Sequence, residues 1–159
     1  MLSIEIRKAD RRLEVACAGG ARRSWPIALG RAPRGAKREA GDRRTPEGEY
    51  RISGAARRSR FHLFLPIDYP SRADAERALR ESGLPPRDYQ RIRDAHARGA
   101  SPPPDTALGG SLGLHGEGAR WRGDSADLDW TDGCIAMSDA EIEFLADRAP
   151  AGTPIRILP

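Results

Sequence analysis

Hydrophobic and polar residues alternate through the first third of the chain, and this period of two predicts β-strands with one buried face. The turn sequence KADR and a pair of glycines divide the alternation into three runs. The hydrophobic positions of these runs are Leu2, Ile4 and Ile6, then Leu13, Val15 and Cys17, and then Trp25, Ile27 and Leu29. Residues 31–48 are polar and rich in glycine and proline, so they predict a long surface loop. Strand character returns in EYRIS and in RFHLFLPID.

The hydrophobic period lengthens in residues 71–99, where it predicts two helices. Ser71 and Asp74 have the spacing of a capping box at the start of the first helix, and the sequence GLPP ends it. The second helix is expected from about Pro86 to Gly99. A proline-rich tract then connects this hairpin to the strands that follow. We therefore expect a helical hairpin inserted at about 71–99 in a β-domain.

The last third of the chain combines short strands with one helix. SLGLHG predicts a strand that ends at His115, and AGTPIRIL predicts a closing strand. Ser138 and Glu141 have the spacing of a capping box for the helix between these strands. Together the patterns predict a single domain over residues 1–159 that is mainly β, with a helical insertion and a helix after Cys134.

Composition and charge exclude several classes of function. The chain has 159 residues, with 27 Lys plus Arg against 23 Asp plus Glu, and the net charge of +4 is spread along the sequence. A nucleic-acid-binding domain would cluster its basic residues and interleave them with aromatics, so no nucleic-acid partner is expected. No apolar run approaches the roughly 20 residues that span a bilayer. The three histidines are scattered and no CxxC is present, so no metal site is expected.

Cys134 is the first candidate for chemistry, because it lies between Gly133 and a hydrophobic residue, shortly before the last predicted helix. A cysteine is a nucleophile only as the thiolate, so it needs a base or a positive charge and donors for the oxyanion that attack creates. Gly133 lets the backbone approach a substrate closely. His115 is the candidate base, and its neighbour Gly116 leaves room for a ligand. From residue types alone, a buried structural thiol is the alternative, as it is for Cys17 in its strand.

The spacing of these residues adds a further clue. Fifteen residues separate His115 from Thr131, which opens the motif TDGCI. The arrangement resembles the signature of the L,D-transpeptidase catalytic domain (YkuD-type) family: a histidine, 14 to 17 residues, then Ser or Thr, any residue, Gly, Cys and a hydrophobic residue. RTPEGEY, LHG and GTPIRI are similar to other segments of that family. FHLFLPIDYPSRADAERA resembles the branch of the family that contains a Tyr-Pro pair, here Tyr69 and Pro70.

The resemblance implies a β-sandwich catalytic domain that processes peptidoglycan stem peptides without a metal or organic cofactor. By position, Cys134 would attack the carbonyl of the diaminopimelate residue and release D-alanine, and His115 would take the thiol proton and return it. Backbone amides around Gly133 and Cys134 would hold the oxyanion. The family also implies a periplasmic or cell-wall location. The N-terminus has no basic-then-apolar secretory signal, which leaves a cytoplasmic location open.

Three functions are compatible with the resemblance. The first is an L,D-transpeptidase, in which an amine resolves the thioester. The second is a hydrolase on the same fold, either an L,D-carboxypeptidase or an amidase-type enzyme. The third is a non-catalytic cell-wall-binding module, against which the intact Cys134, His115 and Thr131 argue. Two positions depart from residues often found in the family: Asp132 would raise the pKa of the thiol, and Ala136 is similar to the Tyr-Pro branch.

Beyond the catalytic candidates, a second group of residues is expected to contact the substrate. The candidates are His62, Tyr69, Gly116, Asp132 and Trp130. His62 lies opposite the predicted apolar face of its strand, and Trp130 flanks the loop between His115 and Cys134. One or two arginines are expected to bind substrate carboxylates; the set considered is Arg43, Arg44, Arg57, Arg58 and Arg60. We also expect the hairpin at 71–99 to lie over one side of the cleft, because long insertions usually carry function.

Overall fold

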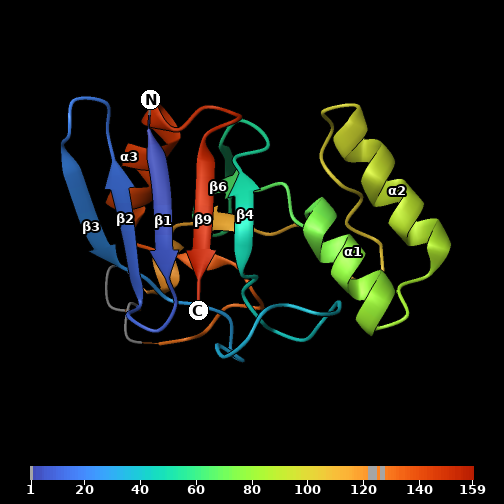
Figure 1. Ribbon diagram of the computed structural model, residues 1–159. Coiled ribbons are helices and arrows are strands. Elements are labelled where there is room, and N and C mark those ends of the chain that lie inside the picture. Colours follow the sequence, from blue (N-terminus) through green and yellow to red (C-terminus); the bar gives the residue numbers. More distant parts are fainter. Residues whose placement is uncertain (1, 122–124, 126–127) are drawn as a thin grey trace.

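The alternating N-terminal segments form a five-stranded sheet together with two later parts of the chain (Figure 1). The computed structural model describes residues 2–121, 125 and 128–159. In spatial order the strands are β3 (Arg22–Pro26), β2 (Arg12–Ala16), β1 (Ser3–Arg7), β9 (Pro154–Leu158) and β4 (Gly48–Arg51). The closing strand β9 pairs in parallel with β1 and antiparallel with β4, so the first and last strands lie side by side within the sheet.

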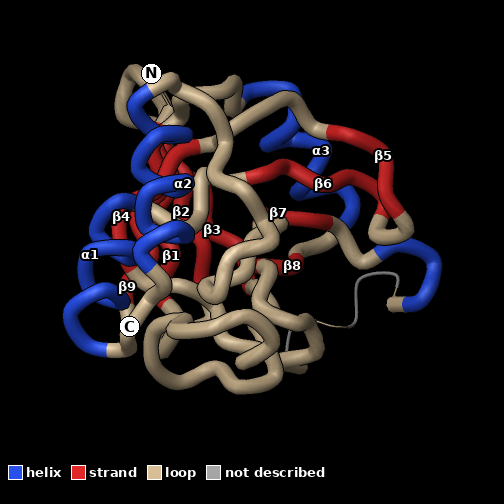
Figure 2. Tube along the Cα trace, turned by 90° about the vertical axis from the view of Figure 1, so that its right-hand side faces the viewer, coloured by secondary structure: helices blue, strands red, loops and turns tan. Residues whose placement is uncertain are grey.

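A second sheet of four short strands lies on the other side of the molecule (Figure 2); it contains His115, and Cys134 directly precedes its strand β8. In spatial order its strands are β5 (Arg57–Ser59), β6 (His62–Pro66), β7 (Gly113–His115) and β8 (Ile135–Ala136). β6 is antiparallel to β5 and to β7, whereas β7 and β8 are parallel. A 3-10 turn, η1 (Gly118–Arg120), follows β7.

Hydrophobic side chains from both sheets meet in one core, against which helix α3 (Asp139–Arg148) packs. Ser138 and Glu141 form the expected capping box at the start of α3. The register explains the core, because the inward residues of β1 pair with inward residues of its neighbours. Burial of each such side chain stabilises the fold by roughly 1.5–3 kcal/mol. The expected mainly β, sandwich-like fold is confirmed. Its central residues are Ile4, Ile6, Leu13, Val15, Ile155 and Ile157 from the first sheet, and Leu65, Leu114, Ile135, Ile142 and Leu145 from the opposite side.

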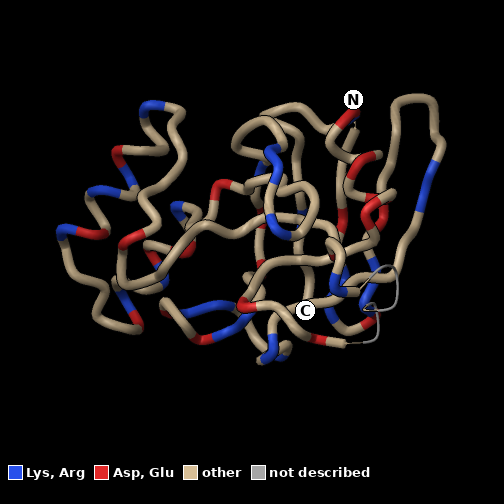
Figure 3. The backbone as a smooth tube through the Cα atoms, turned by 180° about the vertical axis from the view of Figure 1, so that it is seen from behind, with Lys and Arg blue, Asp and Glu red and all other residues tan. Residues whose placement is uncertain are grey.

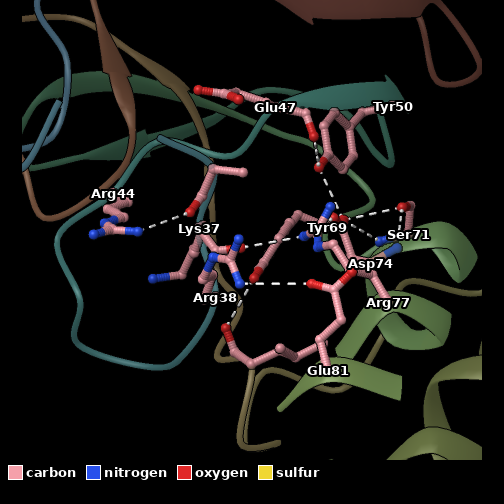
Figure 4. Close-up of polar contacts among 12 residues, drawn as sticks. Lys37, Arg38, Arg44, Glu47, Tyr50, Tyr69, Ser71, Asp74, Arg77 and Glu81 are labelled. Atoms are coloured by element: carbon pink, nitrogen blue, oxygen red, sulfur yellow. Dashed lines mark hydrogen bonds and ion pairs between the residues drawn. The ribbon is translucent and has the colours of Figure 1, made fainter. Parts of the chain in front are cut away.

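Helices α1 (Arg72–Glu81) and α2 (Pro86–Ala97) form a hairpin beyond β4 (Figure 1). Ser71 and Asp74 make the expected capping box. The carboxylate of Asp74 is buried, accepts a hydrogen bond from Tyr50 on β4 at 2.8 Å and forms an ion pair with Arg77 at 2.9 Å (Figure 4). These donors offset the cost of burying the charge. The polar cluster therefore fixes the hairpin to the edge of the first sheet.

The loop between β3 and β4 is irregular, as expected, but two buried lysines hold it in place. Lys8 donates from Nζ to the carbonyl oxygens of Gly35 and Thr45, at 2.8 and 2.9 Å. Lys37 forms an ion pair with Asp42 at 2.7 Å inside the loop. Figure 4 shows Lys37 of this loop near Arg77 of the hairpin, which donates to its carbonyl oxygen. Most residues of the predicted surface loop are exposed or half-exposed, but Lys37 within it and Lys8, which bonds to two of its carbonyls, are buried anchors.

Charged residues of both signs are interleaved over the remaining surface, without a continuous basic stripe in the described chain (Figure 3). Within the same described residues, each helix is too short or too polar to cross a bilayer.

Candidate active site

His115 ends strand β7 and Cys134 directly precedes the neighbouring strand β8, and both face the same side of the second sheet. β7 and β8 pair in parallel, with Leu114 opposite Ile135 and His115 opposite Ala136. Leu114 and Ile135 are fully buried in the core. Because successive side chains of a strand point to opposite faces, the residues next to this pair point away from the core. The register therefore places the thiol and the imidazole on one face as diagonal neighbours.

A cavity of about 600 Å³ opens over this face and is lined by both residues. Its size falls within the range of ligand pockets, roughly 300–1,000 Å³. Aromatic rings form one part of the wall, and charged side chains form another. The lining residues besides His115 and Cys134 are Arg31, Arg60, Phe61, Phe64, Ser111, Glu117, Arg120, Trp130, Thr131 and Asp132.

The imidazole of His115 is buried and held in one tautomer. Its Nδ1 lies 2.7 Å from the carbonyl oxygen of Gly116. A carbonyl can only accept, so Nδ1 carries the proton and Nε2 is left free to accept one. The ring of Phe61 stacks on the imidazole with 4.4 Å between centroids, and Trp130 contacts it edge-on at 5.5 Å. Burial lowers the pKa of His115 below its ordinary 6.5, and nearby Arg60 lowers it further, so the ring is a neutral base at pH 7.

The thiol of Cys134 is protonated in the resting protein. Burial raises its pKa to about 11, and the negative charge of Asp132 contributes to the rise, as expected from the sequence. A hydrogen bond from the backbone of Gly113 opposes this change. The sulfur lies 3.9 Å from the carbonyl oxygen of Ser111. With a neutral thiol and a neutral imidazole, any attack by the sulfur would need a base to accept the thiol proton.

Thr131 and Gly133 shape the turn that presents the sulfur. The hydroxyl of Thr131 donates to the carbonyl oxygen of Cys134 at 2.7 Å and accepts from the amide of Gly133 at 3.1 Å. Gly133 has a φ of 136°, a conformation that other residues rarely adopt. A Cβ at this position would lie 2.9 Å from the carbonyl oxygen of Arg44. The turn therefore depends on both the hydroxyl and the glycine.

Gly116 fits beneath the loop that follows His115 because it has no side chain. A Cβ there would overlap the carboxylate of Asp139 and the carbonyl oxygen of Phe61. Asp139, the first residue of α3, accepts hydrogen bonds from the amides of Glu117 and Gly118 at 2.9 and 3.0 Å. The start of α3 thus holds the peptide whose carbonyl orients His115.

Of the five predicted substrate-binding residues, Asp132 and Trp130 line the cavity, whereas the described lining does not include Gly116, His62 or Tyr69. His62 has a φ of 73°, which breaks the expected alternation, and its Nε2 lies 2.7 Å from Glu143 on α3. Tyr69 is buried, and its hydroxyl donates to the carbonyl oxygen of Leu108. The expectation that His62 and Tyr69 contact a substrate in this cavity is corrected: His62 bonds to α3, and Tyr69 bonds to the loop that follows the hairpin.

The helical hairpin also lies away from the cavity. None of the residues that line the cavity in the described chain comes from 71–99. The hairpin instead packs beside β4 and the loop that Lys37 anchors, where Arg77 donates to the carbonyl oxygen of Lys37. The expectation that the hairpin covers the cleft is therefore wrong, because its buried polar contacts bind it to the opposite edge of the fold.

Several lining residues were not expected from the sequence. Strand alternation predicts Phe61 on the apolar face opposite His62, but His62 is left-handed and the ring of Phe61 stacks on His115. Arg31 belongs to the predicted surface loop, and only a long-range backbone contact brings it to the site. Of the five arginines considered, Arg60 lines the cavity.

The fold agrees with that of known proteins. A search of curated protein sequences gives no match. Among solved structures, the helical cell shape determining protein Pgp2 from Campylobacter jejuni is 20% identical, with a TM-score of 0.62 over 98% of this chain and 46% of that chain. L,D-transpeptidase 1 from Mycobacterium tuberculosis is 14% identical, with a TM-score of 0.54 over 99% of this chain and 62% of that chain. LD transpeptidase LdtMt1 in complex with imipenem is 16% identical, with a TM-score of 0.52 over 99% and 58%.

The present chain thus spans about half of Pgp2 and about three fifths of the transpeptidases it resembles. At these identities the likeness establishes the fold. Independently, the model of the L,D-transpeptidase catalytic domain, YkuD, matches residues 2–157, which include the histidine and the cysteine described above. The chain therefore belongs to the L,D-transpeptidase catalytic domain (YkuD) family.

Proposed function

We propose that this domain catalyses cysteine-dependent acyl transfer on peptidoglycan stem peptides at the cell wall. The observation that carries the proposal is the placement of Cys134 and His115 on one face of two adjacent strands, with Nε2 of the histidine free to accept a proton. The family of the chain supports peptidoglycan as the substrate. The cavity over the two residues is large enough for a peptide segment.

In the first step, Sγ of Cys134 attacks the carbonyl carbon of diaminopimelate while Nε2 of His115 takes the thiol proton. The new C–S bond moves the carbonyl π electrons onto oxygen, where the amide of Cys134 stabilises the charge. We assign this role to the Cys134 amide because the Gly133 amide already donates to Thr131. The C–N bond then breaks as Nε2 returns its proton to the leaving D-alanine, and a thioester remains.

The second step decides between transfer and hydrolysis. We propose transfer to an amine acceptor, which is the reaction after which the family is named. Hydrolysis is the second candidate because Ala136 is fully buried, and its amide and carbonyl both bond to Ala28. That position therefore supplies no polar side chain to hold an acceptor.

Incubation of a diaminopimelate-containing tetrapeptide with an isotope-labelled D-amino acid separates the two candidates. Incorporation of the label at the fourth position indicates transfer, and loss of D-alanine without incorporation indicates hydrolysis. Cys134→Ala should abolish both reactions while Cys17→Ala, a matched change at the other half-buried cysteine, preserves them. Release of D-alanine by Cys134→Ala at the parent rate would refute the proposal.

A carbapenem should form a stable adduct on Cys134, because a strained β-lactam carbonyl undergoes the same acylation. The complex of LdtMt1 with imipenem supports this expectation. Intact-protein mass spectrometry should detect one added drug mass in the parent and in Cys17→Ala, and none in Cys134→Ala. The adduct should form at least about 10²-fold more slowly in His115→Ala, because the general base is lost. Equal labelling of all four proteins would mean that Cys134 is not activated.

A further inference from the structure

An exposed ion pair between Arg31 and Asp132 lies at the edge of the active-site cavity, and Asp132 is two residues before Cys134. Nη1 of Arg31 is 3.3 Å from Oδ1 of Asp132, and both residues line the cavity that contains Cys134. The side chains remain 53% and 77% exposed. A single long contact between exposed groups contributes only about 0–1 kcal/mol to stability. The pair therefore has little value as a structural brace.

The backbone nevertheless holds the two residues side by side. The amide of Thr131 donates to the carbonyl oxygen of Leu29 at 3.2 Å, and the amide of Arg31 donates to the carbonyl oxygen of Thr131 at 3.0 Å. These bonds form a parallel bridge between Gly30 and Thr131. The fold thus presents a cation and an anion together on the same wall of the cavity, and the anion is two residues before Cys134.

Most of the binding capacity of this pair is unused. Asp132 accepts one contact at Oδ1, and Arg31 uses one nitrogen of its guanidinium in a side-chain contact within the described chain. Oδ2 can accept from an ammonium, while the remaining guanidinium nitrogens can donate to a carboxylate in a bidentate geometry. A ligand group that carries both charges on one carbon matches this pattern.

We propose that Arg31 and Asp132 together recognise the zwitterionic end of the diaminopimelate side chain, with Arg31 on its carboxylate and Asp132 on its ammonium. The inference rests on the proposed function, in which the carbonyl of that same residue reacts with Cys134. The side chain of diaminopimelate ends in a free α-amino acid group, whereas lysine at the same position ends in an ammonium alone. The pair therefore selects diaminopimelate stems over lysine stems, and free side chains over those whose amine is already acylated.

Binding to the inactive Cys134→Ala protein tests the proposal without requiring turnover. Three tetrapeptides are compared by isothermal titration calorimetry: one with meso-diaminopimelate, one with L-lysine, and one with diaminopimelate acetylated on its side-chain amine. In the Cys134→Ala background, the first should bind about tenfold more tightly than either of the others, since each loses one charge-assisted contact. The same three peptides are then given to the Cys134-intact protein, and release of D-alanine is measured.

Variants assign each charge to its partner. Arg31→Gln should weaken binding of the diaminopimelate peptide to the level of the lysine peptide and leave the lysine peptide unchanged. Asp132→Asn should weaken binding of the diaminopimelate and lysine peptides and leave binding of the acetylated peptide unchanged. Arg34→Gln and Asp10→Asn remove one exposed charge each outside the cavity, and they should preserve the tenfold preference. A structural role would not change the ratio between peptides, so the ratio is the decisive measurement.

Equal affinity for all three peptides, or an Arg31→Gln variant that weakens all three alike, would overturn the inference. The second result would place Arg31 on the terminal carboxylate that the peptides share. Selective binding without release of D-alanine by the intact protein would support the recognition and refute the proposed reaction. Release of D-alanine at equal efficiency from all three peptides would refute the recognition and leave the reaction standing.

Discussion

Replacement of Thr131 by valine should weaken both the fold and the site, because the shape of the side chain is kept while both of its hydrogen bonds are lost. The hydroxyl accepts from the Gly133 amide and donates to the Cys134 carbonyl oxygen, and Thr131 itself is only 4% exposed. A buried polar group left without a partner costs roughly 1–3 kcal/mol. Two such groups should lower the free energy of unfolding by roughly 2–6 kcal/mol, a large share of the roughly 5–15 kcal/mol typical of a domain.

Equilibrium unfolding in urea measures this loss, and the rate of carbapenem adduct formation measures the effect on the nucleophile. Thr131→Ser is the matched control, because serine keeps the hydroxyl and removes one methyl group, at a cost of about 0.8 kcal/mol. We expect the serine variant to acylate near the parent rate and the folded valine variant to acylate at least about tenfold more slowly. A valine variant within about 0.5 kcal/mol of the serine variant, with an unchanged acylation rate, would show that the hydroxyl does not hold the turn.

Three further predictions concern the base, the glycine and the hairpin. The acylation rate should rise with pH through the pKa of His115, because only the neutral ring accepts the thiol proton. Burial lowers that pKa, so the midpoint of the pH–rate profile should lie below 6.5. A midpoint at or above 6.5 would contradict the assignment of His115 as the base. Gly133→Ala should lower the free energy of unfolding by roughly 1–3 kcal/mol and slow acylation. Alanine is strained at a φ of 136°, and its Cβ would approach the carbonyl oxygen of Arg44. Unchanged unfolding in urea would argue against this close packing. Tyr50→Phe should lower the free energy of unfolding by roughly 1.5–3 kcal/mol, because the hydrogen bond to Asp74 is lost. The folded variant should acylate at the parent rate, and a slower rate would indicate that the hairpin is coupled to the site.

Local patterns in the sequence were sufficient for most elements and for the two catalytic candidates, but not for the short strands β5 and β8. The alternation at Ile4 and Ile6 predicts an inward face because side chains of a strand alternate whatever the strand's partners are. The capping boxes at Ser71 and Ser138 depend only on residues three positions apart, and both are present. Cys134 and His115 could be proposed from spacing because the family motif fixes their separation along the chain.

The tertiary structure decided which side chains surround that pair. Arg31 reaches the cavity only because its backbone pairs with Thr131, a contact between segments 100 residues apart that no local pattern encodes. His62 has a left-handed backbone conformation, which reverses the expected faces of its strand. As a result Phe61, and not His62, contacts the ring of His115. The hairpin lies away from the cleft because the buried Asp74 finds its donor on β4. Local periodicity determines which residues are buried. Buried polar groups must find hydrogen-bond partners, often on distant segments, and these partners determine where each element is placed.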